Sequence, residues 1–504
     1  MVERVVVVGR TYRDSVSLMS ASQSASRLVG VDIATAVSAT PLNLELLQRD
    51  GFSSSQADAA TPADLIIAVR ARDADAAEDA LETIAAELRG GAPDAGPIQS
   101  RPPRSLAAAA RRRPDANLAV VSVPGDRAAY ECATALEAGL NVFCFSSGFD
   151  IGIEAALKRR ARELDLLLMG PDCGTAILGG TGIGFANEVQ RGPVGIVAAS
   201  GTGAQQISCL LDTAGVGVSE LIGVGGRDLS GAVGGVMSAH AISMLGRDPR
   251  TECVVVVGKS PDANVASALA HHLGNTGKRA VLAMPEASIR TPAGVETAGS
   301  LESAAVRAAK LVGVTLELGN PARPTPRPGA TRGLFCGGTL RDEALAVFAA
   351  AMPDGRRPLA IDHVGGSLGT ADAFIDFGSE SLTRGRPHPM IDPNLRDEEL
   401  ARQAADEQVG VVIADVVLGR CAHPDPAAGL VAAIESAVTA RGPDAPAFVV
   451  SLCGAERDPQ GLDRQATLLA EAGATVARSN AQAARIALGA TGVERVRTSG
   501  MGER

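Results

Sequence analysis

Short apolar runs alternate, along nearly the whole chain, with longer stretches in which apolar residues recur every three or four positions. The short runs predict buried strands, and the longer stretches predict amphipathic helices. Regular alternation of the two is typical of α/β proteins, in which helical crossovers join parallel strands. Because 504 residues exceed what one hydrophobic core usually holds, we predict an α/β fold of several domains.

Two segments rich in proline, glycine and arginine interrupt this pattern, and their composition is typical of linkers. They are residues 93–116 and 318–333. The remaining chain divides into a small α/β domain (1–92), an alternating strand–helix domain (117–190) and two further α/β domains (191–317 and 334–504). The last two have the same order of predicted elements, which indicates an internal duplication of a flavodoxin-like unit.

Residues 192–208 contain a candidate anion site. The apolar run Val194–Ala199 predicts a strand, and the turn Ser200-Gly201-Thr202-Gly203 leads into a helix that we expect to begin near Ala204. The first N–H groups of a helix lack intrahelical acceptors, so such a turn suits a phosphate or a carboxylate. The alternative is that Ser200 only caps the helix. A similar turn, Gly337-Gly338-Thr339, follows the strand predicted at 334–336.

Charged residues gather in loops that follow other predicted strands. Because the carboxyl ends of parallel strands meet at one edge of a sheet, we expect these loops to form a ligand site. The candidates are Asp172, Cys173, Gly174, Arg227, Asp228, Arg386, His388, Asp392, Gly419, Arg420, His423 and Arg457. The structural alternatives are a surface ion pair for Arg227 with Asp228, and helix capping by Asp425 and Asp458.

Composition and charge narrow the possible functions. A net charge of −10 argues against nucleic acid or an anionic membrane as the main partner. The eight cysteines are scattered without a CxxC pair, so they indicate reduced thiols rather than disulfides or a zinc site. No apolar run is long enough to cross a bilayer, and no metal-ligand spacing is recognisable. We expect a cytoplasmic protein without a bound metal.

Several motifs resemble those of the FdrA proteins and of succinyl-CoA synthetase. MGPDCGT (169–175), SGTG (200–203) and GVGGRD (223–228) are similar to the synthetase α-subunit and more closely to FdrA. TRGRPHPMIDP (383–393) and GAERDPQ (454–460) are similar to the C-terminal half of FdrA. The resemblance includes VGRTYRDSVSLM near the N-terminus and thus covers nearly the whole chain. It implies a Rossmann-like, CoA-binding-type domain at 117–190 and two flavodoxin-like ligase-type domains at 191–317 and 334–504.

The resemblance implies two different activities. ADP-forming acyl-CoA synthetases pass phosphate from an acyl phosphate to a loop histidine, but residues 284–303, which correspond to that loop, contain no histidine. The Gly-rich start of the CoA-binding domain is also replaced by residues 1–92, and no ATP-grasp domain is recognisable. FdrA proteins are associated with a three-component oxamate carbamoyltransferase, which interconverts oxalurate and phosphate with oxamate and carbamoyl phosphate.

We therefore expect a carbamoyltransferase subunit that works in a hetero-oligomer. Its ligands would be carbamoyl phosphate, or another acyl phosphate, and a small carboxylate acceptor. No cofactor is expected, although the domain type leaves CoA open. The alternatives are an ADP-forming acyl-CoA synthetase and a non-catalytic scaffold subunit.

The resemblance also suggests roles for the candidate residues. The phosphate would lie on the N–H groups of residues 201–203, with the hydroxyls of Ser200 and Thr202 donating. Further phosphate contacts would come from Gly337, Gly338, Thr339, Gly419 and Arg420. Arg386 and Arg227 would supply charge, and His388 or His423 would act as acid or base. Substrate contacts would come from Asp172, Cys173, Gly174, Asp228, Asp392 and Arg457.

Overall fold

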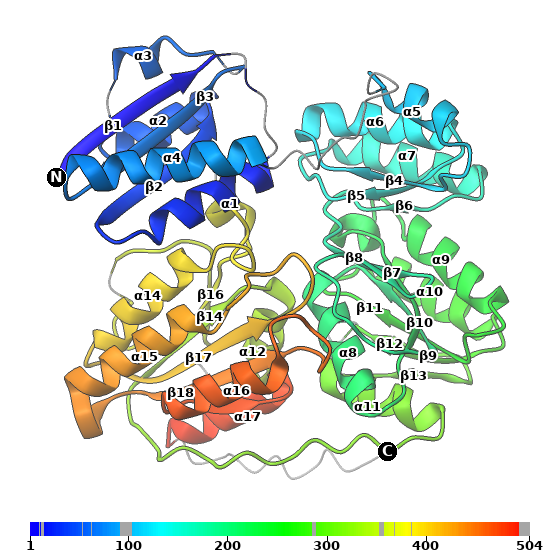
Figure 1. Cartoon of the computed structure of the whole chain (residues 1–504). Coiled ribbons are helices and arrows are strands. Elements are labelled where there is room, and N and C mark those ends of the chain that lie inside the picture. The colour runs from blue at the N-terminus through cyan, green and yellow to red at the C-terminus, as the bar shows by residue number, and fades with distance from the viewer. Residues whose placement is uncertain are drawn as a thin grey trace. The chain divides into compact units, whose positions relative to one another are not determined.

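The computed structural model of the chain describes residues 1–9, 11, 15–52, 54–61, 63–90, 103–284, 289–351, 357–366, 368–384 and 386–492. These residues form two compact units, Met1–Pro102 and Pro103–Arg504 (Figure 1). Among the helices of the described residues, none combines the length and the apolar character needed to cross a membrane.

The first unit is a three-stranded antiparallel sheet with helices on both faces. The strand order is β1-β3-β2. Its strands are β1 (Val2–Val8), β2 (Val31–Ser38) and β3 (Leu65–Ala71), and its helices are α1 (Ser15–Ser26), α2 (Pro41–Arg49), α3 (Ser55–Asp58) and α4 (Ala74–Gly90). Apolar side chains of α1 and α4 share one core with the sheet, and those of the α2–α3 segment fill a second core. This agrees with the small α/β domain predicted from the sequence.

The second unit begins with a short parallel sheet of order β4-β5-β6. Its elements are α5 (Leu106–Arg112), β4 (Leu118–Val121), α6 (Gly125–Glu137), β5 (Asn141–Cys144), α7 (Ile151–Glu163) and β6 (Leu168–Met169). Asp150 caps α7 by accepting hydrogen bonds from the N–H groups of Gly152 and Ile153. Helix α5 lies within the segment that the sequence predicts as a linker.

A seven-stranded sheet follows, with the order β13-β12-β11-β9-β10-β7-β8. Its strands are β7 (Thr175–Leu178), β8 (Thr181–Gly184), β9 (Arg191–Ala198), β10 (Val218–Gly223), β11 (Cys253–Val257), β12 (Arg279–Ala283) and β13 (Val295–Thr297). Its helices are α8 (Gly201–Thr213), η1 (Gly226–Leu229), α9 (Val236–Arg247), α10 (Ala263–Gly274) and α11 (Leu301–Leu311). Strands β7 and β8 pair antiparallel at one edge. They therefore belong to this sheet, although the predicted domain boundary lies after them, at residue 190.

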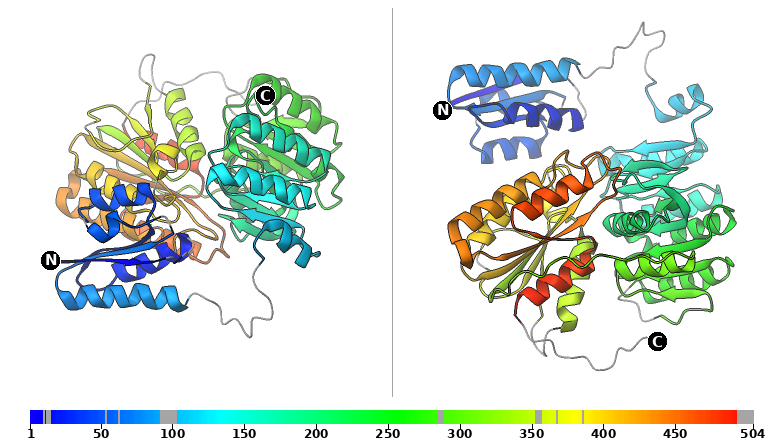
Figure 2. Two further views of the ribbon diagram at one scale, coloured as in Figure 1. Left: turned by 90° about the horizontal axis from the view of Figure 1, so that it is seen from above. Right: turned by 60° about the horizontal axis from the view of Figure 1, so that its bottom comes forward.

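The C-terminal sheet is entirely parallel, with the order β15-β16-β14-β17-β18-β19. Its strands are β14 (Ala330–Phe335), β15 (Leu359–Ile361), β16 (Ala373–Asp376), β17 (Val409–Val417), β18 (Ala447–Cys453) and β19 (Thr475–Ala477). Its helices are α12 (Gly338–Ala351), α13 (Glu380–Thr383), α14 (Asn394–Ala405), α15 (Ala428–Arg441), η2 (Gly442–Asp444), α16 (Leu462–Glu471) and α17 (Asn480–Ala490). Figure 2 shows helices on both faces of this sheet.

The two larger sheets share one strand order. The sequence β10-β9-β11-β12-β13 in the first sheet matches β16-β14-β17-β18-β19 in the second. Both have the flavodoxin-like order, so the predicted α/β fold class is confirmed. In each sheet the first strand of the repeat, β9 or β14, is followed by a helix at the point where the strand order reverses, which is where such folds bind ligands. These helices are α8 and α12.

Helices α8, α11, α12 and α17 pack together between the two larger sheets. Buried side chains from both domains, such as Ile207 of α8 and Phe348 of α12, belong to one continuous hydrophobic cluster. The duplicated domains are therefore joined through a shared core, and this core fixes α8 relative to α12.

Candidate functional site

The N-termini of α8 and α12 meet directly. Ser200 caps α8, and its Oγ accepts a hydrogen bond of 3.0 Å from the N–H of Gly203. The same Oγ lies 2.6 Å from Oγ1 of Thr339, in the first turn of α12. A side chain at Gly337 would overlap Thr202, so glycine is required there for the helices to approach. Because the first N–H groups of a helix have no intrahelical acceptors, both helices present donors to one region.

Lys259 and Asp376 flank the start of α12. Lys259 follows β11 and pairs with Asp342 of α12, Nζ to Oδ2 3.2 Å. A Cβ at Gly338 would lie 2.8 Å from Nζ of Lys259 and 2.6 Å from Oδ2 of Asp376, so these two groups share the space beside that glycine. Desolvation raises the pKa of Asp376, and the nearby Arg341 and Lys259 act in the opposite direction.

His388 lies beside Asp376 and Gly378. Its Nε2 is 2.8 Å from the position that a Cβ at Gly378 would occupy, and Oδ1 of Asp376 is 3.3 Å from that position. The Nδ1 atom accepts a hydrogen bond of 3.2 Å from the N–H of Met390. The ring packs against Phe185, with the centroids 5.5 Å apart. Desolvation lowers the pKa of His388 to about 4, so the ring is neutral at physiological pH.

Asp172 approaches the site from the short parallel sheet. It follows the cis Gly170-Pro171 bond with a left-handed backbone, φ 58°. Desolvation raises the pKa of its carboxyl, Arg227 opposes this, and Glu380 adds to it. Lys259 also lowers the pKa of Asp172, so the ammonium that flanks α12 acts on this carboxylate as well.

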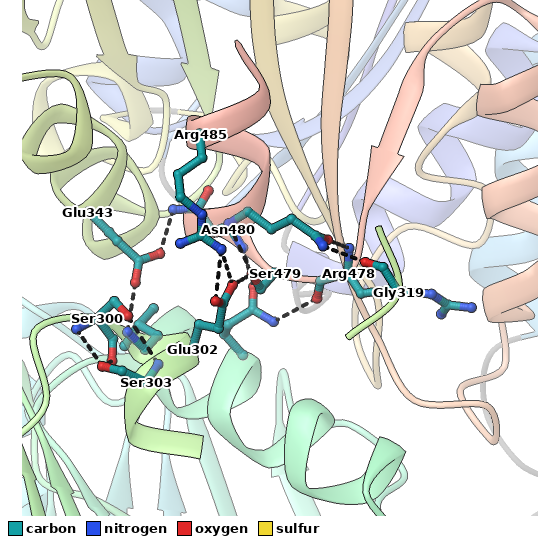
Figure 3. A network of polar contacts seen from close by, with 12 residues as sticks. Ser300, Glu302, Ser303, Gly319, Glu343, Arg478, Ser479, Asn480 and Arg485 are labelled. Atoms are coloured by element: carbon teal, nitrogen blue, oxygen red, sulfur yellow. Dashed lines mark hydrogen bonds and ion pairs between the residues drawn. The ribbon is translucent and has the colours of Figure 1, made fainter. Parts of the chain in front are cut away.

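Glu343 anchors α12 to the preceding domain, one turn after Thr339 (Figure 3). Its Oε1 accepts a hydrogen bond of 2.7 Å from the N–H of Leu301, the first residue of α11, and its Oε2 accepts one of 2.8 Å from Nδ2 of Asn480. Beside it, Glu302 pairs with Arg485 at 2.8 Å. Burial raises the pKa of Glu343 to about 7. The helix that carries Thr339 is thus held at its second turn by two other helices.

Arg227 and Asp228 each have ion-pair partners within the protein. Asp228 is fully buried, pairs with Lys158 at 3.0 Å and accepts a hydrogen bond of 2.9 Å from the N–H of Ser238 in α9. Arg227 pairs with Glu154 at 2.7 Å. The sequence left open an ion pair between Arg227 and Asp228, but the structure pairs each of them with another residue. They connect η1 to α7 and α9.

Gly419, Arg420 and Arg457 lie where the two larger domains touch. Arg420 pairs with Glu188, and its N–H donates to the carbonyl of Ala186 at 2.8 Å. Arg457 pairs with Asp212 at 3.3 Å. The N–H of Gly419 donates to Gln460 at 3.2 Å. Each of these three predicted anion-binding residues therefore already has a partner within the protein.

The remaining predicted residues are dispersed. The Nδ1 of His423 accepts a hydrogen bond of 3.1 Å from the N–H of Asp425, within a turn. Arg386 and Asp392 line a cavity of about 80 Å³ beside α14. Cys173 is buried, and desolvation raises the pKa of its thiol to about 12. The carbonyl of Gly174 accepts a hydrogen bond of 2.8 Å from the N–H of Phe185.

Sequence reasoning missed Lys259, Asp376 and Phe185. Lys259 directly follows a strand and a glycine, which is the same signal that singled out Arg227. Asp376 ends a strand of apolar residues, where a buried carboxylate is unusual. Phe185 carries no such signal, because only the packing of the β8–β9 loop places it against His388.

Two family models match parts of the chain. One, described as an AllF heavy metal-associated domain, matches residues 1–101, and the other, described as CoA-ligase, matches residues 334–489. Within the described residues, however, no group of three or more His, Cys, Asp or Glu side chains is arranged to hold a metal ion.

Three relatives are similar to all or part of the chain. The uncharacterized protein YahF of Escherichia coli is 36% identical over 502 residues, which cover 95% of this chain and 96% of YahF. A succinate–CoA ligase [ADP-forming] subunit alpha-2 of Trichomonas vaginalis is 31% identical, covering 29% of this chain and 48% of that subunit. An Archaeoglobus fulgidus subunit alpha 2 of the same ligase is 33% identical, covering 29% and 52%. The chain thus matches about half the length of these ligase subunits. The FdrA part of the resemblance stays a prediction.

Proposed function

The chain belongs to the family of the Escherichia coli protein YahF, and we propose that it binds an acyl phosphate as a subunit of the ADP-forming acyl-CoA ligase type. The observation that carries the proposal is the contact between Ser200 and Thr339, because it brings two helix N-termini to one point. The CoA-ligase match over residues 334–489, which include α12, supports it.

The phosphate would lie between the two helix N-termini. The hydroxyls of Ser200 and Thr339 would turn from each other toward phosphate oxygens, beside the first N–H groups of α8 and α12. The ammonium of Lys259 would balance the phosphate charge. Hydrogen bonds to a charged group contribute about 1.5–3 kcal/mol each, so loss of one hydroxyl is expected to weaken binding measurably.

Acyl transfer from this position would leave the phosphate beside the two helix N-termini and the ammonium of Lys259. A nucleophile attacks the acyl carbon, and the bond from that carbon to the phosphate oxygen breaks. Fixed N–H dipoles and Lys259 would stabilise the charge of the departing phosphate. Asp376 and Asp172, whose pKa values are raised by desolvation, are the groups suited to accept the proton of the nucleophile.

The carboxyl edge of the short parallel sheet carries groups that suit CoA. Val123, Phe145 and Ile151 are each more than a third exposed there, and apolar groups of this kind suit a pantetheine chain. Helix α6 starts at the same edge after Pro124, without a side-chain cap, so its N–H groups would suit a CoA phosphate. These residues would hold the thiol that accepts the acyl group.

Carbamoyl transfer is the second candidate. Residues 284–303 contain no histidine, so the chain has no residue there for a phosphohistidine relay. Transfer of a carbamoyl group from carbamoyl phosphate to a small carboxylate acceptor such as oxamate needs only the phosphate site and an acceptor site. The acyl-phosphate site proposed above is common to both candidates.

Binding measurements with the purified full chain test the shared site. Inorganic phosphate, acetyl phosphate and carbamoyl phosphate would be titrated against the wild type, Ser200→Ala, Thr339→Val and Ser243→Ala. We expect about tenfold weaker binding for the first two variants. Ser243, whose hydroxyl contacts His272, is the matched control and should bind as the wild type does. Unchanged affinity in both Ser200→Ala and Thr339→Val would remove the site.

Turnover then separates the two reactions. ADP formed from ATP in the presence of CoA and a dicarboxylic acid would identify the ligase. Phosphate released from carbamoyl phosphate only when oxamate is present would identify the carbamoyltransferase. Both assays would be run with the chain alone and with its neighbouring gene products.

A further inference from the structure

We propose that His388 donates a hydrogen bond from Nε2 to the carbonyl oxygen of the acyl group, and that it does not act as an acid or a base. The inference rests on the proposed function, because it takes the phosphate of the same ligand to lie between Ser200 and Thr339. It replaces the acid–base role that the sequence suggested for this residue.

The hydrogen bonding of the ring decides which nitrogen carries the proton. The N–H of Met390 points at Nδ1, with the two nitrogens 3.2 Å apart. A nitrogen that accepts a hydrogen bond carries no proton, so the neutral ring has its proton on Nε2. The ring is neutral because desolvation disfavours the imidazolium. His388 therefore offers one N–H donor and no free acceptor.

The donor lies next to the start of α12. Nε2 and Asp376 Oδ1 both border the position of a Cβ at Gly378, at 2.8 Å and 3.3 Å. The other carboxylate oxygen of Asp376 borders the Cβ position at Gly338. The imidazole N–H and the α12 N-terminus thus lie on either side of one carboxylate. From this shared neighbour we infer that a ligand whose phosphate contacts α12 would place its acyl group beside His388.

Packing fixes the direction of this donor. Phe185 packs against the imidazole ring with a centroid separation of 5.5 Å and a tilt of 39° between the two rings, and Phe145 packs on Phe185 at 5.8 Å. The Met390 hydrogen bond sets the ring rotation at the opposite edge. A donor held in place before the ligand arrives needs no reorganisation when charge develops.

A neutral donor suits acyl transfer. When the nucleophile bonds to the acyl carbon, an electron pair moves onto the carbonyl oxygen, and the Nε2 hydrogen bond stabilises it. The pair then returns as the bond to the phosphate oxygen breaks, and phosphate leaves with the bonding electrons. The proton stays on Nε2 throughout. A neutral imidazole suits this role better than an imidazolium, because an imidazolium would form an ion pair with Asp376 or with the phosphate instead.

Two stable phosphonates test the proposal, because one has the carbonyl and the other lacks it. Acetonylphosphonate and propylphosphonate would be titrated against the wild type, His388→Phe, His388→Gln and Ser200→Ala. We expect the wild type to prefer the carbonyl ligand about five- to tenfold, which is the effect of one hydrogen bond. His388→Phe keeps the packing against Phe185 and should lose this preference. His388→Gln, which keeps a donor, should retain part of it.

The Ser200→Ala variant separates the two proposals. It should weaken both phosphonates equally and leave their ratio unchanged. A wild-type ratio in His388→Phe would overturn the role of His388 and leave the phosphate site standing. Failure of the wild type to bind either phosphonate would overturn both. Nitrogen chemical shifts of histidine-labelled wild-type protein give a second test without any variant, because a proton found on Nδ1 of His388 would also overturn the proposal.

Discussion

Lys158 and Asp228 form an ion pair of 3.0 Å although neither side chain is exposed to solvent. The ammonium also lies 2.9 Å from Glu154 and donates to the carbonyl of Val224 at 2.8 Å. Charged groups are removed from water only at a large cost, which close and complete pairing offsets. The pair joins α7 of the short sheet to η1 of the following domain.

Replacement of Lys158 by Met is expected to destabilise the protein by about 3–5 kcal/mol, because the buried carboxylate of Asp228 loses its cation and that of Glu154 keeps only Arg227. Urea unfolding, followed by circular dichroism, measures the change. Arg160→Met is the matched control on the same helix, since Arg160 pairs with Glu137, whose side chain is 59% exposed. The control should cost less than about 1 kcal/mol. Equal stability of the two variants would contradict the prediction.

Replacement of Lys259 by Met should weaken phosphate binding about tenfold with little change in stability. The ammonium is 42% exposed, and Arg341 remains as a cation for both Asp342 and Asp376 after its loss. Isothermal titration with inorganic phosphate measures the affinity. Lys310→Met, on the exposed side of α11, is the control for loss of one positive charge. An equal loss of affinity in both variants would indicate a general charge effect rather than a contact.

Replacement of Gly378 by Ala should destabilise the protein by about 2 kcal/mol or more through overpacking. The new Cβ would lie 2.5 Å from the carbonyl oxygen of Cys336 and 2.8 Å from Nε2 of His388. Gly489→Ala is the control, because nothing lies within 4 Å of its Cβ position in α17. That substitution should stabilise by about 0.5–1 kcal/mol through helix propensity. Thermal unfolding of both variants checks the opposite signs.

The pH dependence of stability should reveal Glu343. Its pKa is about 7 in the folded protein against an ordinary value of 4.5, so between these values the folded state binds the additional proton. Stability contributed by this group is therefore fully present below the lower value and is lost as pH rises through about 7. The shift corresponds to ~3 kcal/mol. Glu302 and Arg485 face the same site and modify this value.

The variant Glu343→Gln isolates the contribution of the Glu343 carboxyl to the pH dependence of stability. Chemical unfolding of wild type and variant at several pH values from about 5 to about 8 gives the difference between the two curves. We expect the wild type to lose stability relative to the variant as pH rises. A constant difference across this range would show that Glu343 does not titrate there.

Most strands and helices of the larger domains could be predicted because their apolar runs are long. The apolar run Val411–Val417 reaches to the end of β17, which begins two residues earlier, and the run Arg279–Ala283 coincides with β12. Helix α8 begins three residues before the expected Ala204, because the Ser200 cap satisfies the N–H of Gly203. The β7–β8 hairpin was missed, since strands of four residues leave no clear periodicity.

The candidate site could be predicted only in part. The turns at Ser200 and Thr339 each carry a local signal, but their contact depends on how α8 and α12 pack across two domains. Arg227 and Arg420 show the same limit of local sequence signals. Their charge and their position after strands are visible in the sequence, whereas their partners Glu154 and Glu188 come from distant segments.

The attachment of α12 at two successive turns limits how the site can respond to a ligand. Thr339 contacts Ser200, and Glu343, four residues later, accepts a hydrogen bond from the N–H of Leu301 at the start of α11. Any tilt of α12 that opened the space between the hydroxyls would also remove the acceptor from the N–H of Leu301. A ligand of the proposed phosphate site would therefore have to enter without separation of the two domains, and the fixed spacing of the two helices would limit the size of the anion that fits.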